Sequence, residues 1–155
     1  LLDPNGESVL PTYVLNSVEQ RLAKDEVSHA LRLPDEARVI QINQGVVVDG
    51  STIGIETSYV SANRFGPLER QVRYGVHLYP ILADLGTIVV RTSDMISVAD
   101  PGCRLEGLNN EQDRALLRVV RTAFAIGNLP VEFREAFYDT SKVLYASDTE
   151  GHEQI

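Results

Sequence analysis

Apolar and polar side chains alternate along four segments of the chain, which is the pattern of a β-strand with one buried face. The second and fourth segments are long enough for two strands each, and each contains a dipeptide that favours a tight hairpin turn, Asp49-Gly50 and Gly127-Asn128. We therefore predict two β-hairpins and two further strands. The four segments are residues 12–23, 38–60, 87–99 and 114–139.

Helical spacing of apolar residues appears in two other segments. In residues 24–33, Val27 and Leu31 lie one helical turn apart. Residues 66–86 carry the same spacing over their second half and end at Gly86, a residue type that commonly terminates helices. We expect helices in both segments.

The order of these elements indicates an α+β fold. Hairpins imply antiparallel pairing, and the helices fall between the hairpins instead of following each strand. We therefore predict a mostly antiparallel sheet of about six strands, with the helices packed on one face. Residues 1–11 hold Pro, Gly, Asn and Ser close together and read as a tail or linker, and residues 100–113 read as a short helix or loop.

Composition restricts the partners of this chain. Its 155 residues suit one domain, and the formal net charge is −8 with scattered basic residues, which argues against nucleic-acid binding by this chain alone.

The single cysteine, Cys103, excludes an internal disulfide and indicates a reducing compartment, so we expect a cytoplasmic location. No apolar run approaches the ~20 residues that span a membrane. The sequence begins at Leu1 rather than Met, so we expect a piece of a longer protein.

Motifs for cofactor or metal chemistry are not found in the sequence. There is no phosphate-binding glycine loop, no HExxH and no GxSxG, so we predict no cofactor and no catalytic residue. His29, His77 and His152 are far apart and lack metal-ligand spacing with Cys103, so we predict no metal site. Without a nearby histidine, Cys103 is better explained as a small packed residue than as a nucleophile.

Several short motifs occur in an order that resembles the UTRA domain, the ligand-sensing half of GntR/HutC-family bacterial transcription regulators. The family pattern runs through an acidic helix ending in Leu-x-Leu, an Asp-Gly turn, a Glu-x-Ser-Tyr strand, a helix start and a closing hairpin. The likeness covers roughly residues 12–146, with 1–11 as the remnant of a linker and 147–155 as a tail. The matching motifs are Leu31 and Leu33, Asp49-Gly50, Glu56-Thr57-Ser58-Tyr59, HLYPIL and GNLPVEFREAFYD.

The resemblance implies a fold shared with chorismate lyase and a function in transcription regulation. It implies a homodimer that binds a small-molecule effector, with DNA bound only through a winged helix-turn-helix that is absent from this chain. We therefore expect a sensor and not an enzyme. An enzyme of the chorismate lyase type and a ligand-free dimerisation module remain as alternatives.

The resemblance also places the candidate ligand-binding residues. Family members that sense phosphorylated sugars carry Arg-x-Arg on the first hairpin strand, where this chain has Gln44 and Val46. Arginine forks bind phosphate and these two side chains do not, so we expect an effector that is not phosphorylated. The full set of candidates is Gln44, Val46, Glu56, His77, Tyr79, Glu132, Arg134 and Tyr138.

Structural roles are alternatives to ligand contact for these residues. Gln44 also fits a satisfied interior amide, and Glu56 and Glu132 also fit ion pairs with Arg121 or Arg134.

The sequence leaves two pairing registers for the hairpin of residues 38–60. A two-residue turn at Asp49-Gly50 places Glu56 on the face opposite Gln44, whereas a three-residue turn that includes Val48 places both side chains on one face.

Overall fold

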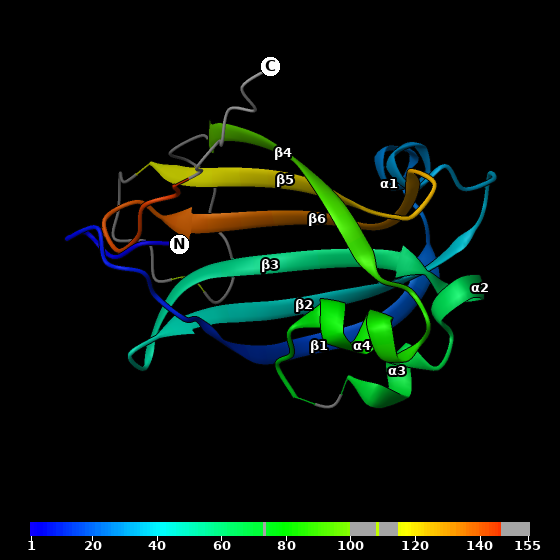
Figure 1. The fold of residues 1–155 in the computed structure, drawn as a ribbon, viewed down its shortest axis with the longest axis horizontal. Helices are drawn as coiled ribbons and strands as arrows, with labels where there is room; N and C mark the ends of the chain where they lie inside the picture. Colours follow the sequence, from blue (N-terminus) through cyan, green and yellow to red (C-terminus); the bar gives the residue numbers. More distant parts are fainter. Residues whose placement is uncertain (73, 100–107, 109–114, 147–155) are drawn as a thin grey trace, which may run out of the picture.

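The computed structural model describes residues 1–72, 74–99, 108 and 115–146. Six strands form one antiparallel sheet in the order β1-β2-β3-β6-β5-β4 (Figure 1). The fold class predicted from the alternation is confirmed. The strands are β1 (Thr12–Leu22), β2 (Arg38–Val48), β3 (Ser51–Ser61), β4 (Val89–Ala99), β5 (Leu116–Ala125) and β6 (Leu129–Asp139).

The β2–β3 hairpin has a two-residue turn, yet it places Gln44 and Glu56 on one face. Asp49 and Gly50 have φ values of 48° and 74°, as a tight hairpin turn with two left-handed residues requires. Val48 pairs with Ser51, and a register shift at Ile53 then brings Gln44 opposite Glu56. We expected a two-residue turn to place these two side chains on opposite faces. That expectation is wrong, because a β-bulge after the two-residue turn supplies the extra residue that brings them to one face.

In the described part of the chain, four short helices connect the strands, and they lie on both faces of the sheet. They are α1 (Asp25–Leu31), α2 (Ala62–Phe65), α3 (Leu68–Gln71) and α4 (Leu78–Asp84). Helices α2 to α4 pack on Ile40 and Ile42, whereas α1 packs on Val39, which points to the other face. The expectation that all helices pack on one face is wrong. In Figure 1, α1 lies beside the β5–β6 turn, where Arg32 donates to the backbone oxygen of Asn128 at 3.0 Å.

Helical spacing across residues 66–86 does not produce one continuous helix. Helix α4 begins at Leu78, after an irregular stretch that contains Gly75. A Cβ atom at Gly75 would lie 1.8 Å from the backbone oxygen of Tyr13, so only glycine lets this stretch approach β1. The chain then leaves α4 through Gly86, as expected, with φ of 82°.

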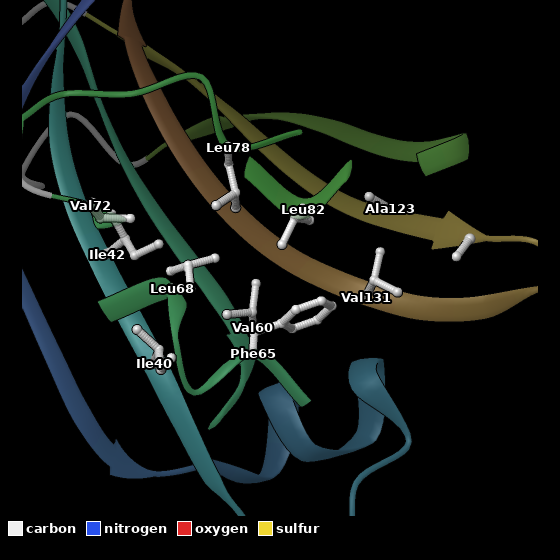
Figure 2. Close-up of a cluster of buried hydrophobic side chains, with 11 residues drawn as sticks. Ile40, Ile42, Val60, Phe65, Leu68, Val72, Leu78, Leu82, Ala123 and Val131 are labelled. Atoms are coloured by element: carbon white, nitrogen blue, oxygen red, sulfur yellow. The ribbon is translucent and has the colours of Figure 1, made fainter. Parts of the chain in front are cut away.

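The main apolar core fills the space between α2 to α4 and one end of the sheet. Figure 2 shows the side chains of Phe65, Leu68 and Leu82 pointing toward the strand residues Val60 and Val131. Burial of such side chains contributes roughly 1.5–3 kcal/mol each. This core holds the helices at one end of the face, and the same face becomes polar toward its other end, where the candidate site lies.

Three sequence predictions lie outside the described residues. They are the short helix or loop at 100–113, of which only Leu108 is described, the packed role of Cys103, and the tail at 147–155. Of the two predicted hairpins, the second turns at the expected Gly127-Asn128, but the turn has three residues, 126–128, because Ala125 pairs with Leu129.

Candidate functional site

A buried arginine lies at the centre of the polar half of the sheet face. The guanidinium of Arg134 on β6 contacts Oε1 of Glu132 at 2.8 Å and Oε2 of Glu56 at 3.3 Å. The exposed fractions of these side chains are 13% for Arg134, 0% for Glu132 and 2% for Glu56. Buried charges of this kind persist only when they are paired, so the three residues form one electrostatic unit.

Neighbouring hydroxyl groups donate hydrogen bonds to the two carboxylates of this unit. Ser58 on β3 donates to Oε1 of Glu132 at 2.7 Å, and Tyr138 on β6 donates to Oε1 of Glu56 at 2.6 Å. Among the described atoms, the buried Oε2 oxygens of Glu56 and Glu132 have no hydrogen-bond partner, although that of Glu56 lies 3.3 Å from the guanidinium of Arg134. Buried polar atoms are nearly always satisfied in proteins, so these oxygens mark places where water, or at Glu56 a ligand, would bind.

The irregular stretch before α4 forms one wall of the site. Gln44 binds its backbone twice, donating from Nε2 to the oxygen of Val76 at 3.2 Å and accepting at Oε1 from the Val76 nitrogen at 3.3 Å. His77 is the residue before the helix, and its ring packs edge-on against Tyr13 at 4.8 Å between centroids. The amide of Gln44 is therefore a positioning group for this wall.

A second arginine lies directly beside the first. Arg121 on β5 pairs with Arg134 in the sheet register and points to the same face. Its Nε and Nη2 donate to the two carboxylate oxygens of Asp94 on β4, each at 2.7 Å. The hydroxyl of Tyr145 also donates to Asp94, and Nη2 of Arg121 donates to that hydroxyl at 3.2 Å.

Two adjacent cavities open onto these groups. The first has a volume of about 340 Å³ and is lined by Gln44, His77 and Tyr79, and the second has about 310 Å³ and is lined by Glu56 and Tyr138. Both cavities also share three lining residues, Tyr13, Arg121 and Arg134. Together they have the size of a site for a small metabolite.

Burial and charge shift the proton affinities of this site. Burial raises the pKa of Tyr79 to about 12, helped by the carboxylate of Glu132. Burial likewise raises the pKa of Tyr13 to about 12 and drives that of Tyr138 still higher, in both cases with help from Glu56. For Arg134, burial lowers the pKa, but Glu132 and Glu56 outweigh it and hold the value well above its ordinary range.

The charges of the site nearly cancel. Two guanidinium groups, Arg121 and Arg134, face three carboxylates, Glu56, Glu132 and Asp94. Each arginine is already engaged by an acid, so neither presents a free cationic fork to the cavities. The carboxylate of Glu56, which lines a cavity, instead favours a ligand group that donates hydrogen bonds, such as a hydroxyl or an amine.

The structure brings most of the sequence-predicted residues together. Gln44, Glu56, His77, Tyr79, Arg134 and Tyr138 line the cavities, and Glu132 lies fully buried behind Arg134. Val46 does not line either cavity, because it packs fully buried with Ile53 and Val119. Glu56 and Glu132 pair with Arg134, and Arg121 pairs with Asp94 instead.

Sequence reasoning missed four residues of the site: Tyr13, Asp94, Arg121 and Tyr145. Arg121 had a usable signal, because counting outward from the Gly127-Asn128 turn places it opposite or next to Arg134. Asp94 had none, since its pairing with Arg121 follows from how β4 joins the sheet.

The described part of the chain has neither a metal-binding cluster nor a membrane-spanning helix. No group of three or more His, Cys, Asp or Glu side chains there is arranged to hold a metal ion. No helix there is long and apolar enough to cross a membrane.

A model of the UTRA domain family matches residues 8–143, which is most of the chain. The chain therefore belongs to the UTRA domain family, as the motif order in the sequence indicated.

One relative is a bacterial transcriptional repressor. The HTH-type transcriptional repressor PhnF of Mycolicibacterium smegmatis is 25% identical over 128 residues, which cover 81% of this chain and 52% of that protein. This chain thus spans about half the length of that relative.

Solved structures share the fold. The effector domain of PhnF from Mycobacterium smegmatis superposes with a TM-score of 0.84 at 20% identity, covering 92% of this chain and 89% of that one. The ligand-binding domain of a protein described as a GntR-family transcriptional regulator from Bordetella bronchiseptica gives 0.86 at 21% identity, covering 97% and 95%.

Proposed function

We propose that this chain is the effector-binding domain of a GntR-family transcription regulator. It binds a small polar metabolite in the two cavities around Arg134 and controls DNA binding by a winged helix-turn-helix domain of the same regulator. One observation carries the proposal: a buried cluster of charged residues borders two cavities of metabolite size, and the carboxylate residue Glu56 of that cluster lines one of them. We assign residues 12–146 to this domain, residues 1–11 to a linker and residues 147–155 to a tail, and we expect the regulator to act in the cytoplasm.

The charge balance supports a ligand without a phosphate group. A phosphate would need a free cationic fork, but Arg134 is held by Glu56 and Glu132, and Arg121 is held by Asp94. A neutral or cationic compound with hydroxyl or amine groups would instead donate to Glu56, which lines one of the cavities. Each hydrogen bond to such a charged group contributes roughly 1.5–3 kcal/mol.

A thermal-shift screen of metabolites against the isolated domain tests this proposal. Polyols, sugars and amines should include compounds that raise the melting temperature, whereas sugar phosphates should not. Glu56→Gln should weaken a hit about ten- to a hundredfold, as the loss of one charged hydrogen bond predicts. Tyr138→Phe should weaken it less, because only a hydroxyl is lost.

Glu135→Gln is the matched control for Glu56→Gln. Glu135 lies on the other face of the sheet, paired with Arg118 at 2.6 Å, and its side chain is 33% exposed. This variant should bind the hit as the wild type does. A sugar phosphate that strongly stabilises the wild type, and binds Glu56→Gln equally well or better, would contradict the proposed ligand chemistry.

The cavities also bear on the two alternative functions. A ligand-free dimerisation module would have packed space beside Gln44, but a cavity of about 340 Å³ lies there. A lyase acting on a dicarboxylate would use unengaged cationic groups, whereas Arg121 and Arg134 are both paired with acids. The sensor function is therefore the one that these observations favour.

We further propose that the domain forms a homodimer through β4. This strand is one of the two edges of the sheet, runs for 11 residues and contains neither lysine nor proline, which commonly protect such edges. Its apolar side chains are exposed, with 68% exposure for Met95 and 70% for Val98. A second copy would cover them and provide the two-fold symmetry that palindromic operators require. Light scattering should show a dimer, and a monomer at high micromolar concentration would refute it.

A further inference from the structure

Arg121 lies between the cavities and the exposed edge strand. It lines both cavities, and its guanidinium faces Asp94 of β4, its direct partner in the sheet register. Both hydrogen bonds of the pair measure 2.7 Å, the geometry of a bidentate arginine–carboxylate contact. The orientation of this guanidinium therefore depends on a residue that lines neither cavity.

Asp94 is itself fixed by a third group. The hydroxyl of Tyr145, from the segment after β6, donates to the same carboxylate that accepts from Arg121. The hydrogen bonds from Arg121 and Tyr145 hold the pKa of Asp94 below its ordinary value despite partial burial. The carboxylate is therefore charged at neutral pH, and its negative charge lies beside the positive charge of Arg121.

We infer that Asp94 is a specificity-determining residue, which excludes anionic ligands by holding and neutralising Arg121. The inference rests on the proposed function, since it concerns the ligand class of the same site. With Asp94 present, the Arg121 fork points to the edge strand and its charge is compensated. With Asp94 removed, Arg121 becomes an uncompensated cation beside Arg134, and the two cavities become a site for phosphate or carboxylate groups.

Inorganic phosphate is the probe that tests this inference, with the melting temperature as the readout at constant ionic strength. Asp94→Asn should respond to phosphate at a concentration at least tenfold lower than the wild type does. The matched control is Asp84→Asn, which makes the same charge change at an exposed position at the end of α4. That control should respond as the wild type does.

The double variant Asp94→Asn/Arg121→Gln assigns the effect to Arg121. It should lose the gained phosphate response, because the freed guanidinium is gone. A response of Asp94→Asn equal to the wild type would overturn the inference, and so would a gain that survives Arg121→Gln. If Asp94→Asn proves unfolded by circular dichroism, Asp94→Ser breaks the same contact in a smaller side chain and is judged by the same outcomes.

The experiment is independent of the natural effector. A phosphate gain in Asp94→Asn, combined with a metabolite screen that finds no ligand for the wild type, supports the role of Asp94 and counts against the effector-binding proposal. A metabolite that binds the wild type, combined with no phosphate gain in Asp94→Asn, leaves the effector-binding proposal standing and refutes the role of Asp94.

Discussion

Replacing Arg134 by methionine should destabilise the domain far more than replacing an exposed arginine. The substitution keeps the apolar stem of the side chain and removes the cation. Glu132 and Glu56, with side-chain exposures of 0% and 2%, would then be buried carboxylates without a counter-charge. Removal of one partner from a buried ion pair costs about 3–5 kcal/mol, chiefly because the other charge stays buried and unpaired.

This magnitude is measurable by urea denaturation or calorimetry. For a domain of 155 residues, each kcal/mol lowers the melting temperature by roughly 2–4 °C, so Arg134→Met should lower it by about 6–20 °C. Arg118→Met is the matched control on the other face of the sheet. Its pair with Glu135 is one-third exposed on each side, so the expected cost of losing that pair is only about 0–1 kcal/mol.

A double variant separates lost charge pairing from lost packing. Glu132→Gln/Arg134→Met should be more stable than the sum of the two single changes predicts, because the double variant leaves one buried charge fewer. The coupling expected for residues in one network is about 0.5–3 kcal/mol. Additive effects, or a loss for Arg134→Met no larger than for Arg118→Met, would refute the view that these three residues form one electrostatic unit.

Two further predictions concern Tyr79 and Gly54. The pKa of Tyr79, about 12, lies above the ordinary 10.0, so its neutral form stabilises the fold below pH 10 and this contribution is lost as the pH rises toward 12. Tyr79→Phe should therefore lose less stability than the wild type in urea titrations between pH 10 and pH 12, and an equal loss would count against this prediction. A Cβ atom at Gly54 would lie 2.5 Å from the ring of Tyr138, so Gly54→Ala should cost about 1–3 kcal/mol of stability and weaken ligand binding. The control Gly45→Ala, whose added Cβ atom would have its nearest contacts at 3.9 Å, should disturb neither stability nor binding, and equal melting temperatures for the two variants would contradict the prediction.

Local patterns were sufficient to predict the strands and part of the site. Period-two alternation places Glu132, Arg134 and Tyr138 on one face of β6, and all three lie together in the structure. The sequence also carries a signal for the coverage of both sheet faces by helices. Val39 and Ile40 are adjacent apolar residues in one strand, so that end of the sheet is apolar on both faces and needs cover on both.

Other features depend on contacts between distant segments. The bulge at Ile53 is not visible locally, because both registers place apolar residues in acceptable positions; the structure has Glu56 beside Ala136 of β6. The ion pair of Arg121 with Asp94 depends on the register between β4 and β5, which short-range patterns do not specify. The packing of Gly75 against β1 likewise joins residues about sixty positions apart.

The bulge at Ile53 has a consequence for how sequences of this family are aligned and altered. Val47 pairs with Thr52 and Val46 with Gly54, so Ile53 is the extra residue that the bulge takes up between the turn and Glu56. A deletion of Ile53 would therefore restore the regular ladder and keep Gln44 opposite Glu56, with Glu56 and Ser58 still facing Arg134. A single insertion between the turn and Glu56 would instead need a second bulge, and without one it would turn Glu56 away from Arg134. Single deletions there should therefore be tolerated better than single insertions, and an alignment gap in this hairpin belongs at Ile53.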